Sequence, residues 1–162
     1  MTQIKSALAT VRDTLIEGVA LVAVSKTKPV ELLQEAYEAG QRDFGENKVQ
    51  EMALKAEAMP KDIRWHMIGH VQTNKIKYMA SFVHLVHGVD REKVLKELDK
   101  QAKKANRTIN CLLQVHIAQE ETKFGWSVDE LEAVLPNLSA YSNVKVCGLM
   151  GMASNTSDKE QV

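Results

Sequence analysis

The sequence is poor in cysteine and aromatic residues and has no excess of charge of either sign. Its 162 residues include two cysteines and 5% aromatic residues, with 21 basic side chains against 21 acidic ones. Two cysteines, Cys111 and Cys147, cannot build a disulfide framework, and both lie in apolar segments, so we expect reduced core thiols in the cytoplasm. The balanced charge argues against nucleic acid as a partner and against a polybasic membrane patch.

The sequence also has no long hydrophobic run. No segment approaches the roughly 18 consecutive apolar residues that a membrane helix needs. Residues 1–14 contain charged side chains and no long apolar stretch, so they do not resemble a secretory signal. We therefore expect a soluble, cytoplasmic protein with a single domain over residues 1–162.

Short apolar segments alternate with amphipathic segments along most of the chain. Strands are predicted for 21–26, 42–44, 64–69, 82–89, 109–117 and 144–152. Helices are predicted for 30–39, 49–56, 75–80, 91–104 and the segment that follows the capping box Ser127-x-x-Glu130. This alternation indicates an α/β fold in which helices cover a parallel sheet.

The number of units falls short of a closed barrel. We count about six βα units, whereas a (β/α)8 TIM-type barrel has eight and typically about 250 residues. A second capping box, Ser157 to Glu160, predicts a helix start just before the chain stops at Val162. We therefore expect an incomplete barrel that lacks its last two units.

A lysine follows the first predicted strand, in the segment LVAVSKTKP. Side chains alternate along a strand, so Val22, Val24 and Lys26 share one face, which we expect to point into the core. Lys26 would then lie at the carboxyl end of that face, where barrels of this kind carry their active sites. A partly desolvated lysine amine can form a Schiff base with an aldehyde. The alternative is that Lys26 and Lys28 are simply solvated at a strand end.

Two further positions have both a structural and a functional interpretation. Asn47, in DFGENKVQE, either caps the next helix or contacts a bound cofactor at the barrel mouth. Glu46 is expected at the same helix start, where a carboxylate favours the helix dipole. Met150, at the end of the last predicted strand, is either a core residue or a packing surface for a flat heterocycle.

The histidines do not form a metal-binding pattern in the sequence. His66 and His70 are four residues apart, as in a helical metal pair, but Gly69 and the strand-like lead-in argue against the helix that such a pair requires. We therefore expect no metal. His66 alternates with Ile68 and is predicted to be an inward, hydrogen-bonded residue. Asp90 is predicted to cap the following helix.

Taken together, the motifs resemble one known family. In order, they are AVSKTKP, FGEN-x-VQE, WH-x-IG-x-VQ-x-NK, VDREK, Lys123-Phe124-Gly125 and GLMGM. This series is similar to the pyridoxal phosphate homeostasis proteins, which are related to the N-terminal barrel of alanine racemase. The resemblance extends from about residue 21 to residue 153. The sequence differs from the family pattern at Met67, Val71 and Gly88, all of which a core or rim tolerates.

The resemblance implies a fold, a cofactor and a function. The fold would be a single-domain (β/α)8 barrel of pyridoxal phosphate fold type III. Lys26 would hold pyridoxal 5′-phosphate (PLP) as a Schiff base, and Asn47, His66, Ile68 and Met150 would shape the ring pocket. The protein would be a non-catalytic carrier that contributes to intracellular PLP (vitamin B6) and amino-acid homeostasis, with PLP-dependent apoenzymes as partners.

The resemblance also leaves points open. In the family, a serine-containing stretch after strand seven and a glycine-rich turn after strand eight hold the phosphate, and neither is present in this sequence. A complete barrel would be monomeric, whereas the strand edges of a shorter chain allow association.

An alternative function is a PLP-dependent amino-acid racemase or decarboxylase of fold type III. Alanine racemase takes its second base, a tyrosine, from an additional β domain, and this chain has no such domain. Tyr37, Tyr78 and Tyr141 lie in predicted helices or just before a strand. Without a second base, two-sided proton transfer is hard to arrange. A third interpretation is an interaction module in which Lys26 is inert.

Overall fold

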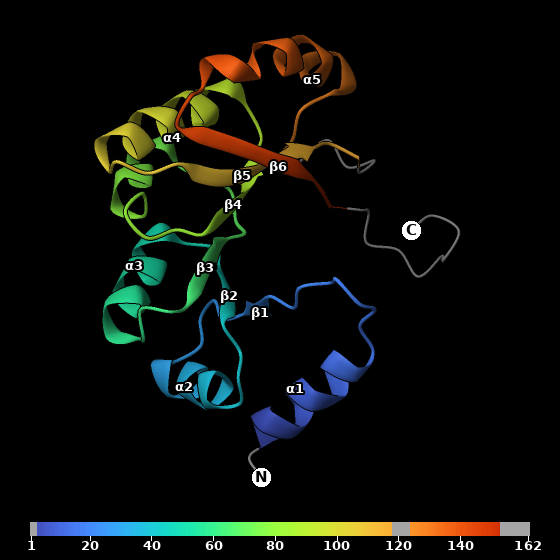
Figure 1. The fold of residues 1–162 in the computed structure, drawn as a ribbon, viewed down its shortest axis with the longest axis vertical. Helices are drawn as coiled ribbons and strands as arrows, with labels where there is room; N and C mark the ends of the chain where they lie inside the picture. The colour runs from blue at the N-terminus through green and yellow to red at the C-terminus, as the bar shows by residue number, and fades with distance from the viewer. Residues whose placement is uncertain (1–2, 118–123, 153–162) are drawn as a thin grey trace.

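The strands form one parallel sheet whose spatial order follows the chain (Figure 1). The structure is a computed structural model, and it describes residues 3–117 and 124–152. The strands are β1 (Ala23–Val24), β2 (Asp43–Glu46), β3 (Arg64–Met67), β4 (Leu85–Val89), β5 (Ile109–Val115) and β6 (Val144–Gly151). Each strand pairs in parallel with the next. All six predicted strands are therefore confirmed, although β1 is shorter than expected.

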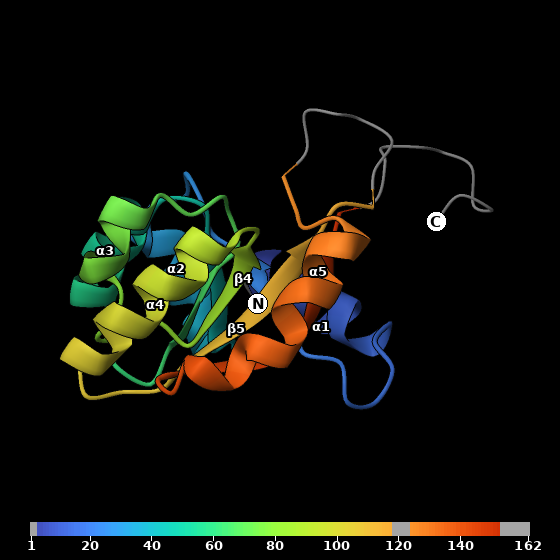
Figure 2. The ribbon, with the colours of Figure 1, turned by 90° about the horizontal axis from the view of Figure 1, so that it is seen from above.

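The helices alternate with the strands as the sequence predicts. They are α1 (Gln3–Asp13), α2 (Val30–Glu38), α3 (Val49–Ala58), η1 (Thr73–Tyr78), α4 (Glu92–Lys104), α5 (Val128–Val134) and η2 (Leu135–Ala140). Helices α2, α3 and α4 lie along one face of the sheet (Figures 1 and 2). The α-helix expected at 75–80 is instead the 3-10 helix η1. None of the helices in the described ranges combines the length and apolar character of a membrane span.

The core lies between the sheet and these helices. Helix α4 illustrates the pattern, because its four buried residues follow helical spacing while the rest of the helix is mostly charged or polar. These buried residues are Val94, Leu95, Leu98 and Ala102. The strands present Phe44, Trp65 and Leu113 to the same layer, and all of them are nearly inaccessible to solvent. Burial of this apolar layer is the main stabilising contribution to the fold.

The other face of the sheet is exposed where the sequence predicted a core. Val24 is 54% exposed and Leu149 on β6 is 60% exposed. The prediction that Val24 points into a core is therefore wrong, because the covering helices α2 to α4 pack on the opposite face. Cys147, also on β6, is exposed as well, and only Cys111 has the core position that was predicted for both thiols.

The predicted helix caps have mixed outcomes. The Ser127 capping box is confirmed: the Glu130 N–H donates to Ser127 Oγ, and the Ser127 N–H donates to a Glu130 carboxylate oxygen. The prediction that Asp90 caps α4 is wrong, because Arg91 occupies the N-cap position and the Asp90 carboxylate accepts a hydrogen bond from the Arg91 guanidinium. The capping box predicted at 157–160 lies outside the described residues.

Candidate functional site

The loop after β1 is anchored to the neighbouring strand by Ser25. The Ser25 N–H donates to the Gly45 carbonyl at 2.9 Å, and its hydroxyl donates to Glu46 Oε1 at 2.6 Å. Ser25 and Glu46 are both buried, on the helix-covered side of the sheet. Glu46 is the last residue of β2 rather than part of a helix start, so its predicted role at the helix dipole is wrong. It instead fixes the residue that precedes Lys26.

A buried lysine on α3 completes this anchor. Lys55 Nζ donates to the Ser25 carbonyl, to Glu46 Oε1 and to Glu51 Oε1, each at 2.7 Å. Its side chain is 7% exposed, and Glu46 is fully buried. A buried charge is tolerated when it is paired and hydrogen-bonded, as here. Hydrogen bonds from Lys55 and, secondarily, from the Thr27 backbone lower the pKa of Glu51, although partial burial opposes the shift.

The loop is also held at Thr27, the residue that follows Lys26. The Thr27 N–H donates to Glu51 Oε1 at 2.7 Å. Thr27 has φ = 62°, in the left-handed region that a β-branched residue rarely adopts. The surrounding hydrogen bonds must maintain this backbone conformation. Lys26 is therefore bracketed by two fixed residues.

Lys26 itself follows the carboxyl end of β1 and has an exposed side chain. The burial that was expected to desolvate its amine is absent within the described residues, for the same reason that Val24 is exposed. The neighbouring residue Ser25 is buried on the opposite side of the loop. The structure thus presents a primary amine to solvent from a loop whose flanking residues are held by hydrogen bonds, at the carboxyl edge of the sheet.

Asn47 and Ile68 lie at the same edge, at the ends of β2 and β3. Ile68 donates its N–H to the Glu46 carbonyl at 2.9 Å, and a Cβ on Gly69 would lie 2.6 Å from the Asn47 carbonyl oxygen. The backbones after β2 and β3 can approach this closely only because position 69 is glycine. Asn47 does not cap α3, whose N-cap is Lys48 without a side-chain hydrogen bond.

The side chain of Ile68 reaches back toward β1. A Cβ on Gly45 would lie 2.9 Å from Ile68 Cδ1 and 3.1 Å from Val22 Cγ1. Val22 and Ile68 therefore meet over Gly45, on the face opposite the buried Ser25 and Glu46. Asn47 also lines a cavity of about 330 Å³ together with Met67, His70 and Lys75.

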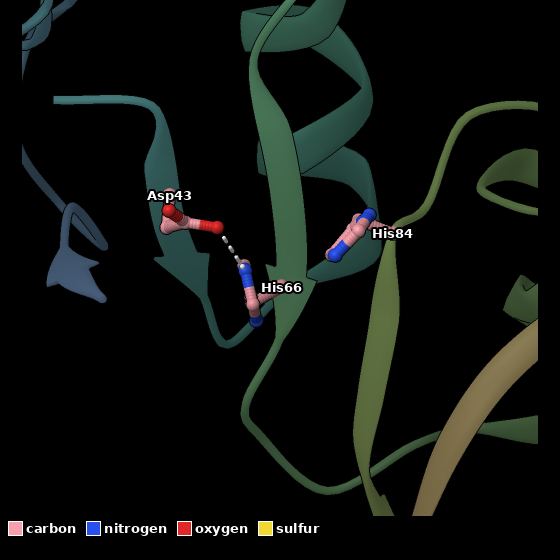
Figure 3. A group of neighbouring side chains, drawn as sticks. All are labelled: Asp43, His66 and His84. Carbon is pink, nitrogen blue, oxygen red and sulfur yellow. Dashed lines mark hydrogen bonds and ion pairs between the residues drawn. The ribbon is translucent and has the colours of Figure 1, made fainter. Parts of the chain in front are cut away.

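His66 lies within a polar cluster that includes residues from β2 and β4. Its Nε2 is 3.0 Å from Asp43 Oδ1, and its Nδ1 is 2.9 Å from His87 Nε2. Figure 3 shows Asp43 and His66 pointing toward each other from adjacent strands. His66 is 4% exposed, which confirms the inward, hydrogen-bonded position predicted for it. Burial, reinforced by the adjacent His66, lowers the pKa of His87 to about 4.

Met150 lies on β6, at the opposite end of the strand order from β1. It pairs with Gln114 of β5 and is half-buried. The structure therefore brings Asn47 and Ile68 together near the end of β1, places His66 deeper on the same sheet, and leaves Met150 at the other edge. The roles of these four residues in a ring pocket remain predictions.

A stacking contact between His70 and Phe124 was not predicted from the sequence. The His70 ring stacks on Phe124 with centroids 4.0 Å apart, and its Nδ1 is 2.8 Å from Asp90 Oδ2. The Trp126 indole N–H donates to the Val89 carbonyl at 2.7 Å. Residues 118–123, including the motif residue Lys123, lie outside the described residues.

The buried hydrogen-bonded group that holds the loop before Lys26 was also not predicted from the sequence. It consists of Ser25, Glu46, Glu51 and Lys55. One signal was present, because Glu51 and Lys55 are spaced i, i+4 on a predicted helix, which favours an ion pair. The burial of Glu46 had no such signal. It depends on β2 and α3 packing together so that a strand carboxylate meets a helix ammonium group.

These features define a class of protein. The strands run parallel in chain order, helices cover one face, and an exposed lysine follows the first strand on a loop that is fixed by hydrogen bonds. This is the arrangement of a β/α-barrel domain that presents its reactive group at the carboxyl ends of the strands.

Comparison with known proteins identifies the family. The sequence matches the family "Alanine racemase, N-terminal domain" over residues 1–162. It is 41% identical over 139 residues to the pyridoxal phosphate homeostasis protein of Synechocystis sp., covering 85% of this chain. It is 33% identical over 172 residues to the protein of the same name from Escherichia coli, covering 98% of this chain and 74% of that protein. The chain belongs to the alanine racemase N-terminal domain family and, within it, to the pyridoxal phosphate homeostasis proteins.

A solved structure confirms the fold. PipY of Synechococcus elongatus PCC7942 without PLP matches with a TM-score of 0.91 and 37% identity, covering 96% of this chain and 74% of that one. PipY with PLP bound matches with a TM-score of 0.86 and 38% identity, covering 95% of this chain and 72% of that one. The expected barrel of the alanine racemase class is therefore confirmed, with six of its strands in the described residues. The chain spans 64% of the length of the Synechocystis relative.

Proposed function

We propose that this chain binds PLP through Lys26 and contributes to PLP and amino-acid homeostasis in the cytoplasm without catalytic turnover. The observation that carries the proposal is the anchored loop, which presents the Lys26 amine at the carboxyl edge of the sheet. Support comes from the relatives, which are named for PLP homeostasis, and from PipY, which has a structure with PLP bound.

The residues at this edge fit such a cofactor in their chemistry. When bound, PLP supplies an aldehyde that condenses reversibly with a primary amine to form a Schiff base and release water. The exposed amine of Lys26 is such a group, and hydrogen bonds to Ser25 and Thr27 fix its backbone. Asn47 offers an amide and Ile68 an apolar surface at the ends of the two next strands. We propose that these two residues, with His66 and Met150, border the ring.

The absence of turnover is also part of the proposal. The family includes alanine racemase by name, so an amino-acid racemase or decarboxylase is the alternative. Two-sided proton transfer needs a second base opposite the lysine. Tyr141, one of the three tyrosines, donates to Glu92 at 2.9 Å, and burial together with that hydrogen bond raises its pKa to about 12, which does not suit a proton acceptor.

An absorbance titration tests the proposal. We expect the purified protein to develop a Schiff-base absorption band with PLP, and we expect the band to be absent in Lys26→Ala. A Lys28→Ala variant is the matched control, because it removes a lysine two residues away, and it should keep the band. A band of equal strength in Lys26→Ala would contradict the assignment. Racemisation of alanine well above the rate with free PLP would favour the enzyme alternative.

A further inference from the structure

A second group of side chains lies away from Lys26, on the adjacent strands β2, β3 and β4. One ligand-type atom each from Asp43, His66 and His84 lies within 4.8 Å of the other two. Asp43 is the first residue of β2, His66 is in β3, and His84 directly precedes β4. Figure 3 shows the three side chains converging between these strands, with a ring nitrogen of His84 turned toward His66.

We propose that Asp43, His66 and His84 form a binding site for a divalent transition-metal ion with the ligand preferences of Zn²⁺. Two imidazole nitrogens and one carboxylate oxygen are a donor set that zinc uses in sites that keep a further position for water. Asp43 Oδ1 and His66 Nε2 are already 3.0 Å apart, close to the spacing of two ligands on one zinc ion. His84 is exposed, so its ring is free to complete the set from the solvent side.

The surrounding residues orient two of the three ligands. His66 Nδ1 is 2.9 Å from His87 Nε2. With a metal ion on Nε2, the His66 proton resides on Nδ1 and donates to His87, as metal-bound histidines commonly donate to a second group. Arg64 binds both oxygens of Asp43 and fixes the plane of the carboxylate.

The same arginine determines which ions the site favours. The Arg64 guanidinium balances the Asp43 charge, so the cluster has little net negative charge for a hard cation such as Mg²⁺ or Ca²⁺. Neutral imidazoles bind zinc, nickel and copper well. The geometry and the charge balance together favour an imidazole-binding metal.

This site is not the pair of His66 and His70, whose i, i+4 spacing was considered in the sequence analysis and rejected as a metal site. His70 is not a member of the cluster and is paired with Asp90 instead. The inference does not depend on the proposed function, because Lys26 follows the end of β1 and contributes no ligand.

Calorimetric titration of the untagged full chain with Zn²⁺ tests the proposal. We expect saturable binding of one ion and a loss of affinity of about tenfold or more in His84→Gln, since even outer partners of metal ligands typically contribute that much. His84 is exposed, so this substitution should leave the fold intact, which circular dichroism would confirm. His70→Gln is the matched control, because it removes another exposed histidine beside a carboxylate, and it should bind Zn²⁺ as the parent chain does.

Two further measurements separate this site from adventitious binding. Arg64→Gln removes the guanidinium that balances the Asp43 charge and should narrow the preference for Zn²⁺ over Mg²⁺, a change in selectivity that damage to the fold would not produce. Co²⁺ should give visible bands without thiolate charge transfer, which excludes the exposed Cys147 as the ligand. Absence of saturable binding, or affinity that His84→Gln leaves unchanged, would overturn the proposal, as would thiolate charge transfer.

Discussion

At the scale of single residues, Lys55 is the clearest case of a buried charge with a positional role. Its ammonium group has three oxygen acceptors at 2.7 Å and almost no solvent contact. A buried ion pair often contributes little net stability compared with an apolar replacement of both partners. Removal of one partner alone is different, because the remaining carboxylate is left buried without compensation.

We predict that Lys55→Met destabilises the protein by about 3 to 5 kcal/mol, since it leaves the Glu46 charge buried and unpaired. Urea unfolding measures this free energy. Lys96→Met is the matched control: its exposed pair with Glu92 has the same i, i+4 spacing as the pair of Glu51 with Lys55. Its loss should cost at most about 1 kcal/mol. Equal effects of the two substitutions would contradict the account of the anchor.

His87 links stability to pH at the same scale. Its pKa in the folded protein is lowered from 6.5 to about 4 by burial and by His66. Between these values the unfolded chain binds a proton that the folded chain does not, so stability falls as pH decreases through this interval. We predict that lowering the pH from neutral to about 5 reduces the stability of His87→Gln less than it reduces that of the parent chain. Urea midpoints of both proteins at the two pH values measure this difference. An unchanged loss would show that His87 is not the group responsible.

At the scale of elements, the strands differ in how completely they are hydrogen-bonded. Strands β2 to β5 each pair on both sides, whereas β1 and β6 each pair on one side within the described residues. Central strands open only with larger parts of the fold, whereas edges open locally. The loop after β1 is exceptional, because hydrogen bonds to the side chains of Glu46, Glu51 and Lys55 hold it beside an edge strand.

We predict that backbone amides of β3 and β4 exchange with deuterated solvent more slowly than those of β1 and β6. The Ser25 amide should be an exception next to β1, since its N–H donates to Gly45 in a buried setting. Hydrogen exchange with fragment-level mass analysis measures these rates. Lys55→Met should speed exchange around Ser25 and Thr27 and leave β4 unchanged. Uniform acceleration throughout the sheet would instead indicate global destabilisation.

At the scale of the whole molecule, the sequence predicted the order of elements well. Short apolar runs such as 82–89 alternate with amphipathic helical segments such as 91–104, and this alternation predicts a parallel sheet covered by helices. Family motifs around Lys26 then indicated the fold class. The spacing of apolar residues and the short motifs are both properties of neighbouring residues in the chain, and such local patterns are what one sequence predicts best.

What the sequence did not predict depends on contacts between elements. Nothing in the run LVAV distinguishes a strand covered on both faces from one covered on a single face, so the exposure of Val24 was missed. The burial of Glu46 requires an ammonium group from another element. Asp43 and His84 are 41 residues apart, and only the parallel pairing of β2, β3 and β4 brings them to His66.

The central claim is that Lys26 is the residue that holds PLP. The most direct measurement is to incubate the protein with PLP, reduce any Schiff base with borohydride, and locate the added mass by peptide mapping. The account predicts that the label lies on Lys26 and that Lys28 and the other lysines are essentially unlabelled. A label spread over exposed lysines, or concentrated on a lysine other than Lys26, would contradict it.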